Sequence, residues 1–523
     1  MPTVKYNSDQ KLREKILKGV DVLADNVAST LGPRGRNVIL QQKDKNPIIT
    51  KDGVTVASFV HLEDPFENVG VQIIRQASEK TASLAGDGTT TSTVLARAML
   101  KEAQKRIASG ICPLELKRGM ETATKEIVSF LKDMAKPITS MEDVVHVATI
   151  SANGDKEIGK LISEAVEQAG RDGAITIDEG RSLETSLEVI EGFQIDSGYC
   201  ASAFITEERR GAVKHDNALV FVSDYKLENI EDLLPLLETV ARDGRPLVII
   251  ADSIEGQALA GLIMNTVRGT MKILAVKAPR YGQERRKILS DLAIATGATF
   301  ITRESGISMG DVKFEHLGAI KSVDCLKNAT TFIGGKGDSE EIDKRIDTLN
   351  EEIIQTDDIH ECERIQERIT RLASGVSIIH VGGATEVEMG EKKHRIEDAL
   401  EAVRSAQQQG ILPGGGVALI RCVNEIDVEC ENEEQEAGLK IVLEAIKDPV
   451  RQMALNAGIS ADLALQKIEL ASGNNGLDFA TNEVVDMLER GIIDPAKVTI
   501  CALQNAVSVS GALITANYAI CEI

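Results

Sequence analysis

Apolar residues recur at steps of three and four positions over both ends of the chain, which is the spacing of an amphipathic helix. The pattern is regular in residues 10–30, dominates residues 66–136 and returns in residues 411–523. Between the first two stretches, short apolar runs at residues 37–41 and 47–50 predict a hairpin. Both ends of the chain are therefore expected to be mainly helical.

The middle of the chain alternates between strand and helix patterns. Strands are predicted at residues 174–178, 187–191, 218–222, 246–251 and 272–277, and helices at residues 156–170, 229–242 and 254–269. Such alternation favours a parallel sheet with crossover helices. A long charged helical pattern follows at residues 340–374, and residues 376–410 mix the two patterns again.

The predicted helices at residues 229–242 and 254–269 have more apolar positions than one buried face requires. The first helix has two apolar stripes about 100° apart around its axis. The stripes are Leu233, Leu236 and Val240, and Leu234, Leu237 and Ala241. In the second helix the apolar residues that spread past one face are Leu259, Ala260, Leu262, Ile263, Met264 and Val267. A helix buried on two sides and an exposed surface for apolar partners explain this pattern equally well.

Length and charge limit the classes of protein to consider. A chain of 523 residues with 43% apolar residues is expected to form about three domains. The 59 basic and 81 acidic residues give a net charge of −22, which argues against binding nucleic acid or an anionic membrane over a large surface. No window is expected to span a membrane, and the first residues lack the pattern of a secretory signal. These features predict a cytoplasmic protein.

The cysteines and histidines show no spacing typical of a metal site. The eight cysteines are scattered without a C-x-x-C pair, and the seven histidines contain no H-E-x-x-H motif. Most of the cysteines are expected to be small buried apolar residues. A metal ion held by side chains alone is therefore not expected.

The strongest chemical signal is the string AGDGTTT at residues 85–91, directly before a predicted helix. The glycines allow close approach of the backbone to phosphate groups, and the helix start offers unpaired N–H groups and a positive dipole end. Asp87 could hold the magnesium ion of a nucleotide, and the threonines could donate to phosphate oxygens. The alternative is an ordinary helix N-cap. The string is not a Walker A loop, because no Gly-Lys-Ser/Thr follows.

Other candidate residues lie in short polar or glycine-rich segments. A loop rich in glycine and hydrogen-bond donors spans residues 30–37, and Lys51 and Asp52 stand beside a turn at the end of the predicted hairpin. A second glycine-rich segment covers residues 413–418. Each could also be simple turn chemistry, and none decides the function alone.

Three further acids are candidates by position. Asp398 lies in the helical pattern of residues 392–409, where a solvated surface acid is the simpler expectation. Asp478 and Asp494 flank a predicted helix.

Taken in order, these strings resemble the group I chaperonins of the GroEL type. The matching strings are TLGPRGRN (30–37), TKDG (50–53), AGDGTTT (85–91), LKRG (116–119), TISAN (149–153), VKAP (276–279), ATEVEM (384–389), EDAL (397–400), GGGVALIR (414–421) and IDPAKV (493–498). The resemblance extends from about residue 3 to residue 520 with few length changes. Such ordered coverage is far more specific than any single motif.

The resemblance implies a multidomain α/β chaperonin fold. A mostly α-helical equatorial ATPase domain would comprise residues 1–136 and 410–523. A small α/β intermediate hinge domain would comprise residues 137–191 and 376–409, and an α/β apical domain with exposed apolar helices would comprise residues 192–375.

Site residues follow from the resemblance position by position. The nucleotide-binding set would be Thr30, Leu31, Gly32, Pro33, Lys51, Asp87, Gly88, Thr89, Thr90, Thr91, Gly414, Gly415, Asp478 and Asp494. Asp87 would bind Mg²⁺, Asp398 would orient the attacking water with help from Asp52, and K⁺ is a further candidate cofactor. The family has Asn-Ala where this chain has Asp478 and Phe479, which puts the details of base recognition in doubt.

The resemblance also implies a function and partners. The chain would be an ATP-dependent chaperone that binds non-native proteins and folds them in a ring cavity. The client-binding set would be Tyr199, Phe204, Leu234, Leu237, Leu259, Ile263 and Met264. The partners would be further copies of the chain in single or double rings of seven, non-native proteins and a co-chaperonin lid, with no nucleic acid and no membrane. The location would be a bacterial cytoplasm, or the host cytoplasm if the chain is virus-encoded.

Two other functions stay open from the sequence. A passive holdase or scaffold could keep the fold without productive turnover, but it is disfavoured because Asp52, Asp87 and Asp398 are all present. A small-molecule kinase or metabolic ATPase would require a polar pocket in residues 192–375, where the sequence offers apolar helices.

Overall fold

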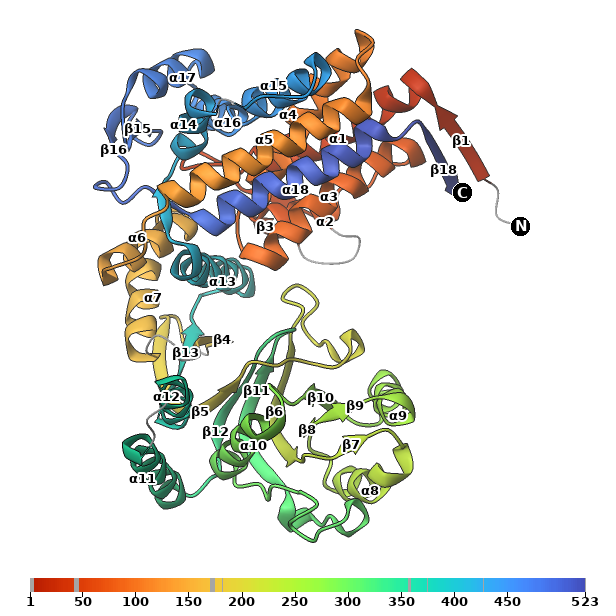
Figure 1. Cartoon of the computed structure of the whole chain (residues 1–523), viewed down its shortest axis with the longest axis vertical. Helices are drawn as coiled ribbons and strands as arrows, with labels where there is room; N and C mark the ends of the chain where they lie inside the picture. The colour runs from red at the N-terminus through yellow and green to blue at the C-terminus, as the bar shows by residue number, and fades with distance from the viewer. Residues whose placement is uncertain are drawn as a thin grey trace. The chain divides into compact units, whose positions relative to one another are not determined.

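The computed structural model describes residues 4–41, 47–169, 175–180, 182–355, 359–373, 375–426 and 428–522. The chain divides into two compact units (Figure 1). The first unit consists of residues 1–163, 181–183 and 381–523, and the second of residues 164–180 and 184–380. The division into three domains stays a prediction.

Long packed helices form the core of the first unit. They are α1 (Asp9–Ala28), α3 (Pro65–Ala85), α4 (Thr89–Ala108), α5 (Pro113–Met134) and α18 (Ala496–Thr515), and they pack on one another (Figure 1). Apolar residues at helical spacing, such as Leu12, Val20 and Leu23 of α1, are fully buried between them. The predicted helix over residues 10–30 and the helical character of residues 66–136 are therefore confirmed.

Shorter elements surround this core. The further helices are α2 (Gly53–Phe59), α6 (Met141–Ser151), α7 (Lys156–Ala169), α13 (Glu386–Gln409), α14 (Val417–Glu425), α15 (Glu433–Ala445), α16 (Asp448–Ala457) and α17 (Ala461–Leu470). Four antiparallel strand pairs accompany them. They are β1 (Val4–Ser8) with β18 (Tyr518–Glu522), β2 (Val38–Leu40) with β3 (Ile48–Thr50), β14 (Ile411–Pro413) with β17 (Ile493–Pro495), and β15 (Asn475–Asp478) with β16 (Glu483–Asp486).

Two sequence predictions about this unit have opposite outcomes. The hairpin expected at residues 37–41 and 47–50 is present as β2 and β3. The helix expected between Asp478 and Asp494 is wrong, because the β15–β16 hairpin occupies that segment. Asn482, which has a positive φ of 62°, makes the tight turn that a helix would not allow.

Helix α18 is long and apolar enough to cross a membrane by length and composition. Its most apolar window is 67% buried inside the protein, between α3, α4 and α5. A core helix of a globular protein has this character, since it is apolar all round and covered on all sides. The expectation that no segment resembles a membrane span is therefore wrong for the length and composition of α18. Its apolar character is explained by its packing in the core of the first unit.

The second unit is built on an eight-stranded mixed sheet with strand order β10-β8-β6-β11-β12-β5-β13-β4. The strands are β4 (Ile175–Glu179), β5 (Ser186–Ile195), β6 (Val213–Val222), β8 (Leu247–Ala251), β10 (Ile273–Lys277), β11 (Gly318–Cys325), β12 (Thr330–Gly335) and β13 (Gly375–Val381). Strands β6, β8 and β10 run parallel, whereas β6, β11, β12, β5 and β13 pair in antiparallel order. The predicted parallel sheet is thus correct for β6, β8 and β10 and wrong for β11, β12, β5 and β13.

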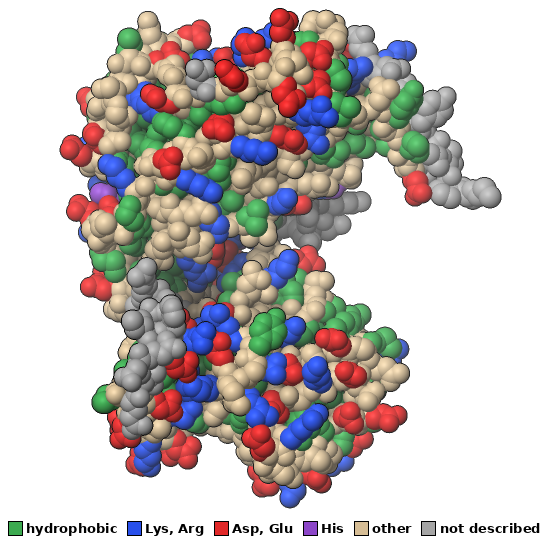
Figure 2. All heavy atoms as spheres, viewed as in Figure 1, with side chains coloured by type: hydrophobic (Ala, Val, Ile, Leu, Met, Phe, Trp, Pro, Cys, Tyr) green, Lys and Arg blue, Asp and Glu red, His purple; other side chains and the backbone are tan. Residues whose placement is uncertain are grey.

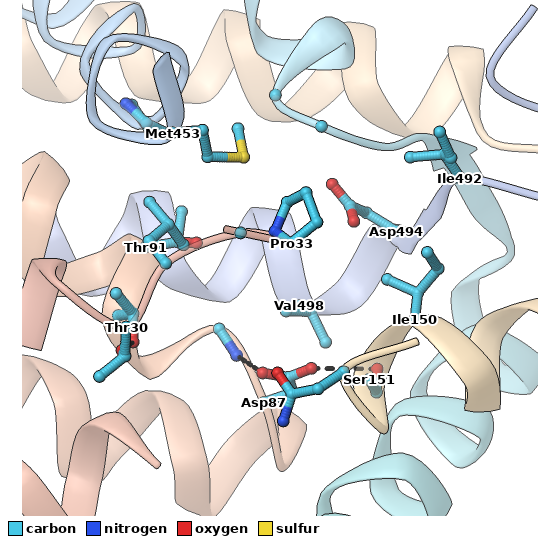
Figure 3. Close-up of a pocket in the computed structure, with 18 of the residues that line it drawn as sticks. Thr30, Pro33, Asp87, Thr91, Ile150, Ser151, Met453, Ile492, Asp494 and Val498 are labelled. Atoms are coloured by element: carbon cyan, nitrogen blue, oxygen red, sulfur yellow. Dashed lines mark hydrogen bonds between the residues drawn. The ribbon is translucent and has the colours of Figure 1, made fainter. Parts of the chain in front are cut away.

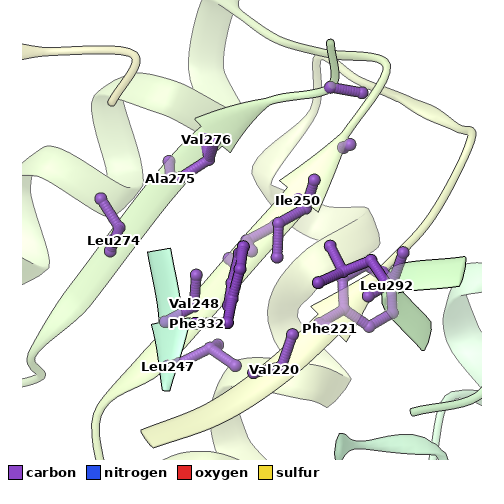
Figure 4. Close-up of a cluster of buried hydrophobic side chains, with 14 of the residues drawn as sticks. Val220, Phe221, Leu247, Val248, Ile250, Leu274, Ala275, Val276, Leu292 and Phe332 are labelled. Atoms are coloured by element: carbon purple, nitrogen blue, oxygen red, sulfur yellow. The ribbon is translucent and has the colours of Figure 1, made fainter. Parts of the chain in front are cut away.

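Helices cover this sheet and its parallel edge. They are α8 (Leu234–Asp243), α9 (Gly256–Val267), α10 (Gly282–Thr296), α11 (Ser339–Gln355) and α12 (Ile359–Ala373). The charged helical pattern at residues 340–374 corresponds to α11 and α12, which pack against each other. Figure 4 shows part of the core, in which Phe221 of β6, Leu292 of α10 and Phe332 of β12 belong to the same buried cluster as the apolar residues of β8 and β10.

Acidic and basic side chains are interspersed over the visible faces of both units (Figure 2). Ion pairs between residues three or four positions apart fit this distribution, such as Arg118 with Glu115 and Lys440 with Glu436. The net charge of −22 is therefore not gathered into one acidic patch on the face that Figure 2 shows.

Candidate functional site

The first unit contains a cavity of about 460 Å³ that is lined by segments from distant parts of the chain. They include the loop after α1, the ends of β3 and α6, the starts of α2, α4 and α14, one face of α13 and the β15–β17 region. Figure 3 shows Thr30, Asp87, Asp494 and Met453 around this space. The volume falls within the range of small-molecule sites in proteins.

The start of α4 forms one wall of the cavity. Helix α3 ends at Gly86 in the left-handed conformation, and Gly88, also left-handed with φ 81°, stands at the N-cap of α4. No side chain caps α4, so the N–H groups of its first turn point to the cavity without a capping partner. An uncapped helix start of this kind attracts anions.

The turn at Gly53 lies directly against this helix start. A Cβ atom at Gly53 would come within 2.6 Å of the Thr90 hydroxyl and 2.7 Å of the Thr89 hydroxyl, so only glycine fits there. Asp52 caps α2 and accepts hydrogen bonds from the Val54 and Thr55 N–H groups, both at 3.1 Å. The capping bonds fix the Asp52 carboxylate at the cavity wall.

Helix α13 supplies a group of charged residues on the opposite wall. Asp398, Arg395 and Glu391 occupy successive turns of one helix face and all line the cavity. Arg395 pairs with Glu391 at 2.7 Å and with Asp155 at 3.2 Å. Burial lowers the pKa of Lys51, the charge of Glu391 opposes this shift, and Arg395 adds to it.

A third wall contains the second glycine-rich segment and the β15–β17 region. Gly416, with φ 76°, is the N-cap of α14 and has no side-chain cap, so a second uncapped helix start borders the cavity. Asp478 is buried and accepts hydrogen bonds from the Ala480 N–H at 2.8 Å and the Thr481 hydroxyl at 3.0 Å. Phe479 is buried in the cluster with Val417. The Asp478 carboxylate is thus held by its own turn.

Two carboxylates of the cavity have raised pKa values. Burial raises the pKa of Asp494 to about 7, and the charge of Asp87 adds to the shift. Burial also raises the pKa of Asp87, hydrogen bonds from Gly88 and Ser151 act the other way, and the charge of Asp52 raises it further. Carboxylates that repel one another in a partly desolvated cavity favour a bound cation, which would neutralise them.

The structure gathers nearly all of the predicted nucleotide residues at this one cavity. Those that line it are Thr30, Leu31, Gly32, Pro33, Lys51, Asp52, Asp87, Gly88, Thr89, Thr90, Thr91, Asp398, Gly415, Asp478 and Asp494. Gly414 is not among the lining residues, and its N–H donates to the Ile492 carbonyl at 2.9 Å. Gly415, which has φ 64°, faces the space instead.

Sequence reasoning missed several lining residues. They are Ile150, Ser151, Asn153, Glu391, Arg395, Met453, Met487 and Ile492. Ser151 and Asn153 lie in the string TISAN, which entered the analysis only as part of the resemblance. Tertiary packing of α6 and α13 brings most of these residues to the cavity. No local sequence pattern predicts this packing.

The second unit presents an exposed apolar surface on α9. Ala260, Met264 and Val267 lie one turn apart and are exposed, with exposures of 50% at Met264 and 71% at Val267. Leu259 and Ile263 beside them are half-buried. We call these five residues the α9 surface. Its apolar residues support the interpretation of an open binding face for this helix.

The remaining predicted client residues differ in exposure. Leu234 of α8 is 46% exposed and Tyr199 is half-buried. Phe204 and Leu237 do not face outward, since their exposures are 0% and 6% and both belong to the core of the second unit. The expectation that these two side chains are exposed is wrong. Phe204 lies in a segment that contacts α9, and Leu237 is the one buried member of the second apolar stripe of α8. The first apolar stripe of α8 is therefore buried, whereas Leu234 and Ala241 of its second stripe are exposed.

The geometry of the first unit suits binding of a polyphosphate with a cation. Two uncapped helix starts can donate N–H groups, Lys51 adds a positive charge, and Asp87 can ligate a cation. Asp398 and Asp52 can orient a water molecule, since phosphoryl transfer to water depends on positioning more than on a covalent nucleophile.

Comparisons with known proteins bear on the family and the fold of the chain. The model of the TCP-1/cpn60 chaperonin family matches residues 23–522. Among solved structures, the chain is similar to the chaperonin gp146 from the bacteriophage EL 2 (Pseudomonas aeruginosa), at 22% identity and a TM-score of 0.69, with 99% of each chain covered. A second crystal form of that protein matches at 23% identity and a TM-score of 0.63, again over 99% of each chain. Both crystal structures of that protein are of the protein in the presence of ATP-BeFx.

Proposed function

Because the chain belongs to the TCP-1/cpn60 chaperonin family, which supports a chaperone role, we propose that it is an ATP-dependent folding chaperone. It binds non-native proteins through the apolar residues of its second unit and hydrolyses ATP in the cavity of the first unit. The observation that supports this most is the convergence of Asp52, Asp87 and Asp398 on one cavity beside two uncapped helix starts.

The residues of the cavity fit a nucleotide with Mg²⁺. A side chain at Gly53 would fill the space between α2 and α4, and the raised pKa values of Asp87 and Asp494 favour a nearby cation. In the described part of the chain, no group of three or more His, Cys, Asp or Glu side chains could hold a metal ion. A magnesium ion at Asp87 would therefore take further ligands from phosphate oxygens and water, as Mg²⁺ commonly does.

The chain's own residues would divide the catalytic work. Bound Mg²⁺ supplies charge neutralisation at the phosphate oxygens. Lys51 and the N–H groups of Thr89, Thr90 and Thr91 hold the phosphates in place. Asp398 accepts a hydrogen bond from the water and orients it, and Asp52 fixes the same water from the start of α2. K⁺ could join this site as a second cation.

Hydrolysis would depend on the position of α13. Asp398 and Arg395 reach the cavity on a helix that packs against α6, α18 and the β17 strand. A shift of the helix would remove the acid that orients the water, while leaving the phosphate-binding loop intact. An acid delivered by a movable helix makes turnover conditional on conformation.

The α9 surface, Leu234 and Tyr199 would bind non-native proteins. Apolar area attracts denatured chains with little regard to sequence, because the hydrophobic effect follows area. The family generally forms ring oligomers that bind non-native proteins, so the protein would act as a homo-oligomer. Rings of seven, single or double, and a co-chaperonin lid belong to the proposal, as does a cytoplasmic location.

The deciding experiment is refolding of a chemically denatured enzyme by this protein with ATP and Mg²⁺. We expect activity to return with the wild type and not with Asp398→Ala. Capture without recovery, even after addition of a bacterial co-chaperonin, would contradict the proposal and favour a passive holdase. Stimulation of hydrolysis by a metabolite rather than by denatured protein would favour a metabolic ATPase.

A further inference from the structure

The carboxylate of Asp87 receives hydrogen bonds from two different parts of the chain. The N–H of Gly88 donates to Oδ1 at 2.5 Å, and the hydroxyl of Ser151 donates to Oδ2 at 3.1 Å (Figure 3). Gly88 follows Asp87 in the sequence, so this donor is present wherever the loop lies. Ser151 is 64 residues away at the end of α6. The second bond therefore exists only while α6 is packed beside the α4 start.

Helix α6 holds Ser151 in a defined place. The helix begins with a capping box in which Asp143 N–H bonds the Ser140 hydroxyl at 3.2 Å and Ser140 N–H bonds the Asp143 carboxylate at 3.1 Å. Its inner face, which includes Val144 and Val147, is buried. Ser151 thus comes to the cavity on a packed helix rather than on a loose loop, which suits precise placement of a functional group.

The hydroxyl of Ser151 bonds across the cavity rather than to its own helix. A serine near a helix end commonly donates to the carbonyl three or four residues earlier. Ser58 and Ser109, at the ends of α2 and α4, do this, with distances of 2.8 Å and 2.7 Å to the Thr55 and Arg106 carbonyls. Ser151 donates to Asp87 instead. Its hydrogen bond therefore contributes to the cavity and not to the end of α6.

The segment just after Ser151 forms an ion pair with α13. Asn153 and Gly154 both have positive φ values, 59° and 86°, and turn the chain back. The Asp155 carboxylate then pairs with Arg395 of α13 at 3.2 Å. Arg395 stands three residues before Asp398, about one helical turn away. The same pair of helices thus brings Ser151 and Asp398 to the cavity together.

We propose that Ser151 is a positioning residue for the cation-binding carboxylate of Asp87, and that it links cation binding to the packing of α6 and α13 on the cavity. This inference rests on the proposed nucleotide function. With Gly88 on one oxygen and Ser151 on the other, the Asp87 side chain has one orientation, and each oxygen keeps a lone pair for a cation. When α6 and α13 move away, Asp87 loses this restraint at the same time as the cavity loses Asp398.

The expected size of the effect follows from other metal sites. Hydrogen-bond partners of a ligating group typically change metal affinity by about 10–100-fold when they are removed. A neutral hydroxyl at 3.1 Å with a second donor still in place should lie at the lower end of this range. We therefore expect loss of the Ser151 hydroxyl to weaken cation binding by about tenfold.

The test compares Ser151→Ala, Ser151→Thr and the control Ser58→Ala in the full-length protein. The probe is Mn²⁺ in the presence of ADP, and free Mn²⁺ is measured by electron paramagnetic resonance. Ser151→Ala should raise the Kd for Mn²⁺ about tenfold. Ser151→Thr restores a hydroxyl and should return the Kd close to the wild-type value. Ser58→Ala should leave it unchanged, and ADP binding without a divalent ion should be equal in all four proteins.

Each outcome decides between a positioning role and its alternatives. Equal Mn²⁺ affinity in Ser151→Ala and the wild type would overturn the inference while leaving nucleotide binding intact. Loss of metal-free ADP binding together with a lower melting temperature, not repaired by Ser151→Thr, would show a merely structural role. A wild-type protein that binds neither ADP nor Mn²⁺ would instead overturn the proposed function, and the inference with it.

Discussion

The cavity of the first unit and the α9 surface of the second unit are candidate binding sites with opposite physical chemistry. The cavity depends on directed interactions, because hydrogen bonds and helix dipoles act only at set distances and angles. The α9 surface offers apolar area, and its attraction for a partner grows with area rather than with orientation. One atom should therefore matter in the cavity, whereas several side chains should share the work on the surface.

Within the second unit, some residues lie beneath the α9 surface and support it, whereas others form the surface itself. Phe204 lies beneath α9 in the core of the second unit, and Met264 lies on the α9 surface. A buried side chain contributes to stability through packing, while an exposed one contributes to binding. Substitution of one side chain of each kind distinguishes the two roles.

The largest effect is expected from Phe204→Ala. The side chain is 0% exposed, so its removal should leave a cavity and destabilise the second unit by about 3–5 kcal/mol. Hydrogen exchange of the amides in α9 and β10 should become much faster, since both elements contact the segment that contains Phe204. Met264→Ala is the matched control and should leave the exchange rates nearly unchanged. Equal effects from the two variants would contradict the assignment of Phe204 to the core.

A hundredfold effect is expected from Asp398→Ala. Removing a group that orients the attacking water commonly lowers a rate by about 10²–10⁴-fold, and we expect the lower value because Asp52 remains. Nucleotide binding should stay close to wild type, so the loss appears in kcat and not in KM. Steady-state hydrolysis of ATP with Mg²⁺ measures both.

The control for this prediction lies on the same helix. Glu401 is one turn beyond Asp398, does not line the cavity and forms a pair with Arg404 at 2.6 Å. Glu401→Ala should keep the hydrolysis rate within about twofold, because exposed ion pairs contribute little. If both variants lost hydrolysis equally, α13 rather than the Asp398 carboxylate would be responsible.

The contrast between the two regions also explains how far the sequence could predict the molecule. The helical ends were predicted well because their apolar residues repeat with one strong period, as in α1. Strand direction was predicted poorly, because local alternation looks the same in parallel and antiparallel strands. Strand β11 pairs with β6 and strand β12 pairs with β5, both far away in the sequence, and no local pattern records such pairing.

The candidate cavity was predicted from residues whose local backbone is itself unusual. Gly88 and Gly415 have positive φ values, and such glycines form conspicuous strings in the sequence. Ser151 and Arg395 sit in ordinary helices, and only the packing of α6 and α13 brings them to the cavity. Their roles could not be inferred from local pattern for that reason.

For the α9 surface, the sequence could not predict which apolar residues are exposed. Leu237 and Met264 both belong to surplus apolar positions of a helix, and hydrophobicity alone does not tell which of the two is covered. Tertiary neighbours decide this, burying Leu237 to 6% exposure and leaving Met264 at 50%. A pattern of apolar residues therefore predicts that a helix has more apolar positions than one buried face requires, but it does not predict which of them are exposed.

A pH-dependent effect is expected from Asp494. Its pKa is raised from 3.8 to about 7 in the folded protein, so the folded state binds more protons than the unfolded state between these values. Stability of the nucleotide-free protein should therefore fall as the pH rises from about 4 to about 7, by at most about 1.4 kcal/mol per pH unit. Above pH 7 this contribution should level off.

Asp494→Asn tests this directly, because the amide does not titrate. The difference in melting temperature between the variant and the wild type should be smallest at pH 4 and should increasingly favour the variant up to about pH 7.5. A constant difference across this range would contradict the raised pKa. Bound nucleotide with Mg²⁺ should reduce the difference, since a nearby cation stabilises the ionised carboxylate.

The smallest effects are expected on the α9 surface. Met264 and Val267 are only partly available to a client, so replacing either with serine should weaken capture of a denatured protein by about twofold, and both together by about fourfold. Gln257→Ser, at an exposed polar position of the same helix, is the control and should have no effect. Capture is measured as suppression of aggregation of a denatured enzyme, with light scattering as the readout. Abolition of capture by one substitution would indicate a directed contact, and the two binding sites would then resemble each other more than their chemistry suggests.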